Sequence, residues 1–371
     1  MSTPERRGID VADPWAAIEA CYDRGWTDGL PVVPPTEGLV DRMLAAGPWP
    51  PADVLLYEPV RDRAVTAYHA AVNAVMAGCR PEYFPVVGAA VQAIGDPEFK
   101  LHGPATSTGG AALMVIVNGP ACRRLGINAR HNLFGPGVRA NATIGRTLRL
   151  VLLNCLDCHP GSLDKSTQGW AGKYTLCFGE DESASPWEPL HVSRGFRAEQ
   201  SAVTVFAAES GHNVLSHAAS TPERVLAGFA DAMAGLSSFS QGRSVLVLAP
   251  EHAAHLRGAG WSRARTQAWL YEHARRSLAD LKRAAKIERD FLGNPEIRRW
   301  LYREDPSRAA AGAGDPDTVQ PEDERIFVRR GLGPDDILLC VGGGDAGGHS
   351  AFFPSWSRGR SVPFVSKEIP E

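Results

Sequence analysis

Three stretches of the chain share one arrangement, in which a short apolar run is followed by a proline-bearing turn, a helical pattern and a glycine. They are LPVVPPTEGLVDRMLAAG (residues 30–47), LMVIVNGPACRRLGIN (113–128) and VLVLAPEHAAHLRGAG (245–260). Two further apolar runs, DILLCV (336–341) and VTVFAA (203–208), are strand candidates. Short apolar strands that alternate with helices are typical of α/β proteins with a buried sheet. We therefore predict an α/β fold with a mixed, partly parallel sheet, flanking helices and long Gly-rich loops.

Other segments carry helical patterns. The helix expected over DPWAAIEACYDRGW (13–26) has Asp13 as its N-cap and Pro14 at its first position. Further helices are expected over VRDRAVTAYHAAVNAVMAGC (60–79), PEYFPVVGAAVQAIGD (81–96) and NATIGRTLRLVLLNCLD (141–157). The last of these is apolar around most of its circumference, which predicts a buried helix.

The length of 371 residues allows one elaborated domain or two domains of ordinary size. We expect a main α/β domain over residues 1–308, which can divide into two sub-lobes near residues 200–240. The segment AAAGAGDPDTVQPEDE (309–324) has the composition of a linker or a surface loop. Residues 325–371 are expected to supply C-terminal strands that return to the main domain.

The charge balance excludes several classes of partner. A formal net charge of -3, without a basic excess, argues against nucleic-acid binding. No apolar run approaches the roughly 18 residues of a membrane-spanning helix, so no membrane partner is expected. The N-terminus lacks the apolar core of a secretory signal, which predicts a cytoplasmic protein. The richness in Ala, Arg, Gly and Pro suggests a bacterial source of high GC content.

The stretch LNCLDCHPG (153–161) contains C-x-x-C-H, the attachment signature of c-type haem. Covalent haem attachment requires export, for which no signal is visible, so haem is not expected. Redox C-x-x-C pairs open a helix, whereas Cys155 and Cys158 come at the end of the helix expected over 141–157. A structural role is favoured for these thiols. A thiol-disulfide or metal-thiolate site on Cys155 and Cys158, with Cys177, stays open as the alternative.

Lysine is scarce in this chain, since only six of the 39 basic residues are lysine. Two of the six, Lys165 and Lys173, lie in GSLDKSTQGWAGKYT (161–175), amid glycines, hydroxyls and an acid. Where arginine is the default cation, a lysine indicates that a compact ammonium or a titratable amine is needed. We therefore predict that Lys173 is a catalytic amine. An exposed surface lysine is the alternative for both positions, and it is favoured for Lys165.

A candidate anion site precedes this lysine-bearing stretch. FGPGVRANATIGR (134–146) places Arg139 and Asn141 at the start of a helix, where backbone amides and a guanidinium suit a carboxylate or a phosphate. In open α/β sheets the ligand crevice lies outside the carboxyl ends of the strands. The polar residues that follow the expected strands are Thr36, Asn118, Glu209, His212, Glu251, His252, His349 and Ser350. Helix capping is the alternative for Thr36 and Asn118.

Two acid–histidine pairs stand three positions apart, Glu188 with His191 and Glu209 with His212. Such pairs supply a general base held by a carboxylate, or metal ligands. A divalent metal on His191, Glu209 and His212 therefore stays open. The glycine-dense CVGGGDAGGHS (340–350) can form an anion nest. It matches neither a phosphate-binding loop nor a dinucleotide fingerprint, so NAD and FAD are not expected.

Several longer blocks resemble one bacterial family. They are WTDGLPVVPPT, NAVMAGCRPEYFPVV, GPGVRANATIGRTLRL, GKYTLCFGEDESASPWEPLHVSRGF and GGHSAFFPSW. The family consists of uncharacterised proteins of about this length, sometimes labelled thiol-disulfide or selenoprotein-associated (UGSC-type). The resemblance covers most of the chain and implies no particular reaction. Its blocks include the neighbourhoods of Asn141, Lys173, Glu188, His191 and His349, and not Cys155 or Cys158.

These observations favour an enzyme that acts on a small anionic, carboxylate-type metabolite by lyase-like or hydrolase-like chemistry. The expected catalytic residues are Lys173, Glu188, His191 and His349, and the expected substrate-binding residues are Arg139, Asn141, Asn118, Ser350 and Thr36. No cofactor is assigned, and a homo-oligomer is compatible with the sequence. The alternatives are the thiol or metal-thiolate protein described above and a non-catalytic binding or accessory protein.

Overall fold

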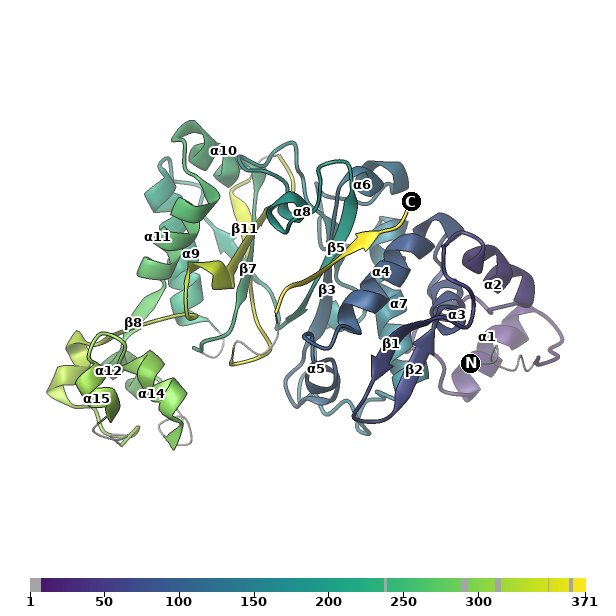
Figure 1. Cartoon of the computed structure of the whole chain (residues 1–371), viewed down its shortest axis with the longest axis horizontal. Helices are drawn as coiled ribbons and strands as arrows, with labels where there is room; N and C mark the ends of the chain where they lie inside the picture. Colours follow the sequence, from purple (N-terminus) through teal and green to yellow (C-terminus); the bar gives the residue numbers. More distant parts are fainter. Residues whose placement is uncertain (1–7, 237–238, 288–292, 311–314, 346, 360–362) are drawn as a thin grey trace. The chain divides into compact units, whose positions relative to one another are not determined.

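The chain forms an α/β structure, as predicted, with helices flanking sheets that contain parallel and antiparallel pairs (Figure 1). The computed structural model describes residues 8–236, 239–287, 293–310, 315–345, 347–359 and 363–371. The chain divides into two units. Unit 1 consists of Met1–Ser210, Cys340–Asp345 and Ser361–Glu371, and unit 2 of Gly211–Leu339 and Ala346–Arg360. Residues 311–314 of the linker-like segment lie outside the described residues.

Unit 1 is built on a four-stranded sheet in the order β12-β5-β3-β4. The strands are β3 (Ala112–Asn118), β4 (Cys177–Gly179), β5 (Ser201–Ala208) and β12 (Val365–Ile369). β3 pairs in parallel with β4, and β5 pairs antiparallel with both β3 and β12. All eight residues of β5 are buried, as expected for an apolar strand inside a sheet that helices cover.

Helices and a hairpin surround this sheet. They are α1 (Pro14–Asp23), α2 (Glu37–Leu44), α3 (Ala67–Ala77), α4 (Phe84–Ile94), α5 (His102–Thr106), α6 (Pro120–Leu125), α7 (Arg139–Leu156), α8 (Leu190–Ser193), the 3₁₀ turns η1 (Pro81–Tyr83) and η2 (Ala171–Lys173), and the hairpin β1 (Val54–Glu58) with β2 (Arg63–Thr66). α4 packs on β5 and β12, while α7 packs on β3, β4 and α3. The core of unit 1 lies where these two helices meet the sheet.

Unit 2 has its own four-stranded sheet, in the order β10-β7-β11-β6, and a two-stranded sheet of β8 and β9. Its strands are β6 (His212–Leu215), β7 (Ser244–Leu248), β8 (Arg275–Ser277), β9 (Phe327–Arg329), β10 (Ile337–Val341) and β11 (His349–Pro354), and the last two residues of β10 are counted in unit 1. Its helices are α9 (Pro222–Gly235), α10 (Pro250–Gly258), α11 (Arg263–His273), α12 (Leu278–Arg283), α14 (Pro295–Leu301) and α15 (Pro306–Ala310), with η3 (Pro321–Arg325) and η4 (Pro334–Asp336). α9 packs against α10, α11 and the strands β6 and β11.

Two of the three repeated strand–turn–helix predictions are confirmed, β3 with α6 and β7 with α10. The prediction is wrong for residues 30–33, which form no strand. Pro31 lies within this run and Pro34 and Pro35 follow it, and proline has no backbone N–H to donate to a strand partner. The first helix begins as predicted, because the Asp13 side chain accepts a hydrogen bond from the Ala16 amide at 2.9 Å.

The helix predicted over residues 60–79 is shorter than expected. Residues Arg63–Thr66 form β2, and α3 begins only at Ala67. The Thr66 hydroxyl caps the His69 amide at 3.4 Å, and the His69 ring accepts from the Thr66 amide at 3.2 Å. This reciprocal capping box fixes the start of the helix.

The buried helix predicted over residues 141–157 is confirmed as α7. It ends earlier than expected, at Leu156, because Asp157 adopts the left-handed conformation with φ 52°. Cys158 therefore lies beyond the helix. The chain then enters one of the long Gly-rich loops, which runs to η2.

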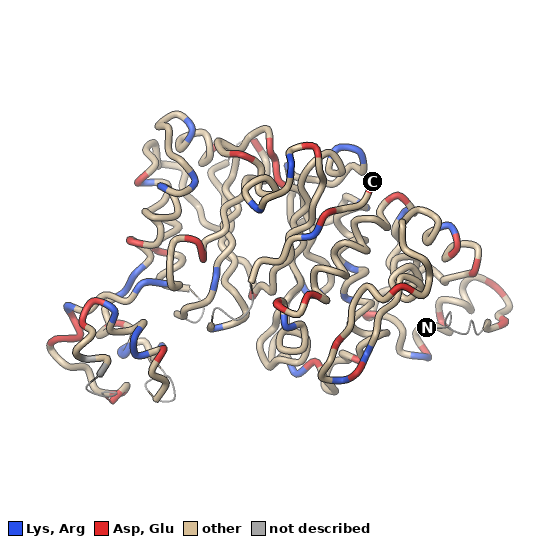
Figure 2. Tube along the Cα trace, viewed as in Figure 1, with Lys and Arg blue, Asp and Glu red and all other residues tan. Residues whose placement is uncertain are grey.

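Charged residues of both signs are interspersed within each unit (Figure 2). This mixture agrees with the small formal net charge of -3. Among the residues that the structure describes, no helix combines the length and the apolar character needed to cross a bilayer.

Candidate functional site

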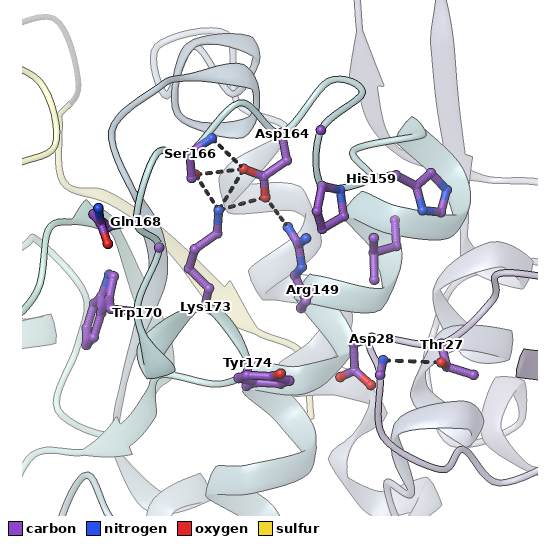
Figure 3. A pocket seen from close by; sticks show the side chains of 15 residues that line it. Thr27, Asp28, Arg149, His159, Asp164, Ser166, Gln168, Trp170, Lys173 and Tyr174 are labelled. Carbon is purple, nitrogen blue, oxygen red and sulfur yellow. Dashed lines mark hydrogen bonds and ion pairs between the residues drawn. The ribbon is translucent and has the colours of Figure 1, made fainter.

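A pocket of about 530 Å³ lies in unit 1 between residues 27–29, helix α7 and the loop that follows α7 (Figure 3). Its lining includes the cations Lys173 and Arg149, the carboxylate of Asp164 and the aromatic ring of Tyr174. A concave site of this volume with a few convergent polar groups is the usual form of a small-molecule site. We therefore take this pocket as the candidate functional site.

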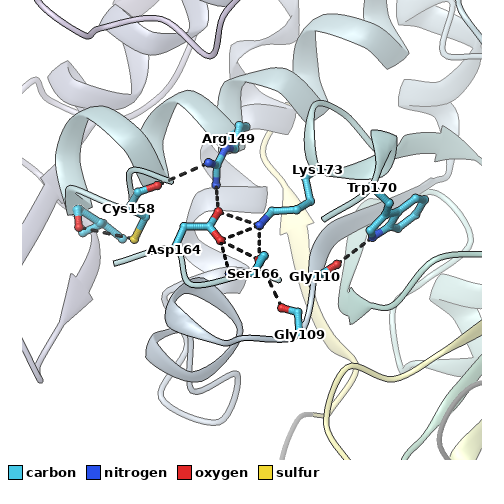
Figure 4. A network of polar contacts seen from close by, with 9 residues as sticks. Gly109, Gly110, Arg149, Cys158, Asp164, Ser166, Trp170 and Lys173 are labelled. Atoms are coloured by element: carbon cyan, nitrogen blue, oxygen red, sulfur yellow. Dashed lines mark hydrogen bonds and ion pairs between the residues drawn. The ribbon is translucent and has the colours of Figure 1, made fainter. Parts of the chain in front are cut away.

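Asp164 is the centre of a polar network at one side of the pocket (Figure 4). Lys173 Nζ donates to Asp164 Oδ1 at 2.8 Å and to Oδ2 at 2.6 Å. The same ammonium donates to Ser166 Oγ at 2.6 Å, and Ser166 Oγ donates to Asp164 Oδ1 at 2.7 Å. Arg149 Nη1 lies 3.1 Å from Asp164 Oδ2. One carboxylate thus holds two cations beside each other.

This network carries an excess positive charge. Burial raises the pKa of Asp164, but the hydrogen bonds from Lys173 and Ser166 outweigh it, so the pKa lies below its ordinary value of 3.8. The ionised carboxylate offsets only one of the two cations. The side chains of Lys173 and Arg149 are 16% and 12% exposed, so water screens this charge only in part. Such a site attracts anions.

Backbone hydrogen bonds fix the loop that carries Asp164 and Ser166. The Asp164 amide donates to the His159 carbonyl at 3.2 Å. The Thr167 amide donates to the Thr108 carbonyl at 2.8 Å, which ties the loop to the segment before β3. The Asp164 carboxylate also accepts from the Ser166 amide at 3.1 Å. These contacts position the carboxylate opposite Lys173 as part of the folded loop.

In the wall formed by residues 27–29, the carboxylate of Asp28 is neutralised by Arg146. Arg146 donates from Nε to Asp28 Oδ2 at 2.8 Å and from Nη2 to Oδ1 at 2.7 Å. Arg146 Nη2 also contacts the carbonyls of Leu30 at 3.1 Å and Pro31 at 3.0 Å. This bidentate pair leaves the excess positive charge of the pocket on the side of Lys173.

Of the four predicted catalytic residues, one belongs to the described lining of the pocket. Lys173 lines the pocket at the end of η2. Glu188 is exposed and is not part of the pocket lining. His191 is fully buried in α8, and His349 is exposed at the start of β11 in unit 2. Of this set, the pocket therefore contains Lys173.

Asn118 and His191 come together in a second polar cluster, outside the pocket lining. Asn118 Nδ2, at the end of β3, donates to Glu180 Oε2 at 2.6 Å and to Glu182 Oε1 at 3.1 Å. His191 Nδ1 lies 3.7 Å from Glu182 Oε1, and neither ring nitrogen of His191 has a hydrogen-bond partner among the described residues. Both Asn118 and His191 have no exposed surface, so a substrate in the pocket does not reach them.

Three predicted binding residues lie elsewhere in unit 1. Arg139 Nε donates to the Gly78 carbonyl at 2.9 Å. Asn141 Oδ1 accepts from the Asn128 amide at 2.8 Å and its Nδ2 donates to the Asn128 carbonyl at 3.0 Å, which clamps that loop to α7. Thr36 is exposed at the N-terminus of α2, without a side-chain cap hydrogen bond. None of the three is part of the described pocket lining.

Ser350 and His349 lie in unit 2. Ser350 Oγ is 2.7 Å from His252 Nδ1, and His252 Nε2 is 3.0 Å from the Ser216 carbonyl. Because the carbonyl requires a proton on Nε2, Nδ1 accepts from the Ser350 hydroxyl. Ser350 and His252 are 5% and 1% exposed, so this pair is satisfied within the protein. His349 Nδ1 is 3.0 Å from Asn213 Oδ1.

The metal alternative named His191, Glu209 and His212. His191 and Glu209 belong to unit 1, whereas His212 belongs to unit 2. Within the described part of the chain, no group of three or more His, Cys, Asp or Glu side chains is placed to hold a metal ion.

The thiols of the C-x-x-C-H motif are free. Burial raises the pKa of Cys155 to about 12 and that of Cys158 to about 11. Burial also raises the pKa of Cys177. Reactive cysteines have a lowered pKa, because the thiolate is the nucleophile. These values weigh against the thiol-redox alternative.

Four residues of the pocket lining are not among the predicted site residues: Arg149, His159, Asp164 and Ser166. Asp164 and Ser166 lie within GSLDKSTQGWAGKYT, the stretch selected for its lysines, so its acid and its hydroxyls were the available signal. Arg149 carried no signal, because arginine is the ordinary cation of this chain. His159 appeared in the sequence only as the histidine of the C-x-x-C-H motif.

A comparison of the chain with protein-family models finds no matching family, and comparisons with curated proteins and with solved structures find no match either. No family model thus supports the resemblance to UGSC-type proteins, and it carries no further argument. The function is therefore inferred from the pocket alone.

Proposed function

We propose that the chain is an enzyme that acts on a small carboxylate-bearing metabolite in the pocket of unit 1, by lyase-like or hydrolase-like chemistry. The observation that carries the proposal is the pair of cations Lys173 and Arg149, which line the pocket and share the single carboxylate of Asp164. A guanidinium suits a carboxylate because its planar fork matches the two oxygens. Among the described contacts of Arg149, Nη1 forms an ion pair with Asp164 and Nη2 donates a hydrogen bond to the Cys158 carbonyl. The guanidinium has five N–H groups, so some of them are left for a ligand.

Lys173 is assigned the stabilisation of negative charge in the transition state. Lyase and hydrolase reactions of carboxylates and acyl groups develop charge on an oxygen, and a fixed cation in a partly dry site lowers the energy of that state. The hydrogen bonds to Asp164 and Ser166 engage the three N–H bonds of the ammonium and hold it in place before substrate arrives. Lys173 therefore acts on the substrate through its positive charge. Asp164 acts as a positioning residue for both cations.

The proton-transfer role falls to His159, which lines the same pocket. Histidine is the side chain most often used for general acid–base catalysis. Ser166 is not assigned as a nucleophile, because its hydroxyl accepts a hydrogen bond from Lys173 and donates one to Asp164. An ammonium that donates to a hydroxyl does not take its proton. The depressed pKa of Asp164 also makes its carboxylate a weak base.

The test is an incubation of the purified protein with a panel of hydroxy-, keto- and unsaturated carboxylates, followed by NMR for substrate loss. We expect Lys173→Met to slow turnover about a hundredfold, the usual cost of removing one group that stabilises the charge of a transition state. Lys165→Met is the matched control, because Lys165 is exposed, donates to the Gly161 carbonyl and is not part of the described lining. Circular dichroism establishes that both variants fold.

Two outcomes would contradict the proposal. Unaltered turnover in Lys173→Met would remove the lysine from the mechanism. Binding of a carboxylate that is always recovered unchanged would replace the enzyme with the non-catalytic binding protein considered above.

A further inference from the structure

The pocket is larger than a carboxylate group requires. Its volume of about 530 Å³ falls in the range of pockets that bury most of a drug-sized ligand. The charged network of Asp164, Lys173, Ser166 and Arg149 forms one side of it (Figure 3). A ligand that fills the pocket therefore has a body beyond its carboxylate, and the remaining walls determine the chemistry of that body.

Tyr174 supplies the main apolar surface next to the cations. It follows Lys173 directly in the chain and lines the pocket, with 47% of its surface exposed. Its ring lies between Lys173 and Asp28 in the view of Figure 3. Its hydroxyl makes no hydrogen bond within the described part of the chain. The exposure of the ring is therefore not explained by a hydrogen bond of the hydroxyl to the protein. Large exposed apolar groups in a concave site are typical of ligand contacts.

The segment that carries Tyr174 is rigid. Trp170 Nε1 donates to the Gly110 carbonyl at 2.8 Å, which fixes the indole. A Cβ added at Gly172 would lie only 2.3 Å from the Trp170 ring, so the indole packs directly on the backbone of η2. The Tyr174 amide closes that turn on the Ala171 carbonyl at 3.0 Å. These contacts hold the backbone from which the Tyr174 side chain projects, next to Lys173 in the chain.

The opposite wall favours an uncharged ligand body. Asp28 is 2% exposed at its side chain, and the bidentate contact with Arg146 neutralises it. A second anionic group on the ligand would find Arg146 already engaged by this carboxylate.

Resting on the proposed function, we propose that the ligand of this pocket is an aromatic carboxylate, with its carboxylate at Lys173 and Arg149 and its ring against Tyr174. Aromatic pairs gain energy beyond that of simple apolar burial, because the positive ring edge of one meets the negative face of the other. The pocket should therefore prefer an aryl ligand over a saturated ligand of the same size and charge.

Calorimetric titration with phenylacetate and with cyclohexylacetate tests this preference. The two acids share one charge and nearly one size, and the saturated acid is the more hydrophobic. We expect the wild-type protein to bind phenylacetate about fivefold more tightly. Tyr174→Leu should abolish the ratio, because leucine keeps the apolar contact without the ring. Tyr57→Leu is the control, since Tyr57 is similarly exposed, at 50%, but lies on β1 outside the described lining.

Each other outcome has a defined meaning. Equal affinities, or tighter binding of cyclohexylacetate, would overturn the aromatic preference and leave the proposed carboxylate site intact. The same holds if Tyr174→Leu keeps the fivefold ratio. If neither acid binds the wild-type protein, or if Lys173→Met binds both undiminished, the proposed function fails and this inference fails with it.

Discussion

The Asp164 carboxylate shows why a buried acid belongs in a site for anions. It accepts hydrogen bonds from Lys173, from the Ser166 hydroxyl and from the Ser166 amide, and it contacts Arg149. Without it, the ammonium and the guanidinium would repel each other at short range in a partly dry pocket. With it, both cations stay together and one positive charge remains in excess.

Replacing this acid should cost stability in a pH-dependent way. We expect Asp164→Asn to lower the free energy of unfolding by about 3 kcal/mol at neutral pH, because it leaves two partly buried cations without their counter-ion. The folded-state pKa of Asp164 is lowered, so its contribution is complete above the ordinary value of 3.8 and is lost as the pH falls through the lower folded value. The difference between wild type and variant should therefore shrink below about pH 4. Urea unfolding at several pH values measures it.

Asp345→Asn provides the control for this experiment. Asp345 pairs with Arg130, but both side chains are more than half exposed, so little change in stability is expected. A pH-independent effect of Asp164→Asn, or an effect no larger than that of Asp345→Asn, would contradict the role given to Asp164.

The sequence predicted individual site residues unevenly. The scarcity of lysine in this chain directed attention to Lys173, and Lys173 lines the pocket, while its catalytic role stays a prediction. Arg149 could not be predicted, because it is one of many arginines in the chain. Its partner Asp164 lies in the loop after α7, and no local sequence pattern specifies the path of that loop. Asn141 shows the opposite case: its position at a helix start predicted an anion site, whereas its amide is used to clamp the Asn128 backbone.

Helix α7 connects the core of unit 1 to the pocket. Its apolar residues pack against β3 and β4, while Arg149 and Leu153 face the pocket. At Gly145 the helix approaches the chain just after Tyr174 so closely that a Cβ would lie 2.3 Å from Thr175 Oγ1 and 2.9 Å from the Leu176 amide nitrogen. The separation between α7 and η2 therefore depends on this glycine.

Gly145→Ala should separate these two elements. We expect a loss of about 1–3 kcal/mol in stability, the usual range for overpacking a core, together with weaker carboxylate binding, because Lys173 moves away from Arg149. Gly38→Ala in α2 is the control, since a Cβ there meets nothing within 4 Å and alanine favours a helix. Thermal unfolding and calorimetry measure both effects. Unchanged binding in Gly145→Ala would show that the spacing does not matter.

The apolar patterns of the sequence predicted most of the helices and strands. The strands β3, β5, β7 and β10 are short apolar runs in the sequence, and the helix α7 is a long one. The apolar run is enough to identify each of them as a buried element. The failures lie where local chemistry outweighs the pattern. Prolines prevent a strand at residues 30–33, and the Thr66–His69 capping box starts α3 later than the periodicity suggests.

The two units of the whole molecule are formed from discontinuous segments. Unit 1 is completed by β12, which pairs antiparallel with β5 from Val365↔Val205 to Ile369↔Ser201. Lys367 adds an ion pair with Asp96 at 2.8 Å. This pairing joins residues more than 150 positions apart, so no pattern within either strand specifies it.

Deleting residues 363–371 should therefore unfold or aggregate the protein, although the pocket lies elsewhere in the sequence. The deletion removes a strand that covers the edge of β5, and an uncovered apolar strand edge promotes association. Removal of Pro370 and Glu371 alone is the control, because neither residue belongs to β12. Size-exclusion chromatography and circular dichroism give the readout. A monomeric, fully folded deletion variant would contradict this account of unit 1.

Lys173 and Arg149 are proposed to bind a carboxylate in the pocket of unit 1. A crystal structure of the protein with phenylacetate tests this proposal. We expect the carboxylate within hydrogen-bond distance of a nitrogen of Lys173 or Arg149, with the ring against Tyr174. A ligand found only at the Asn118–His191 cluster or in unit 2, with the pocket of unit 1 free of it, would contradict the claim.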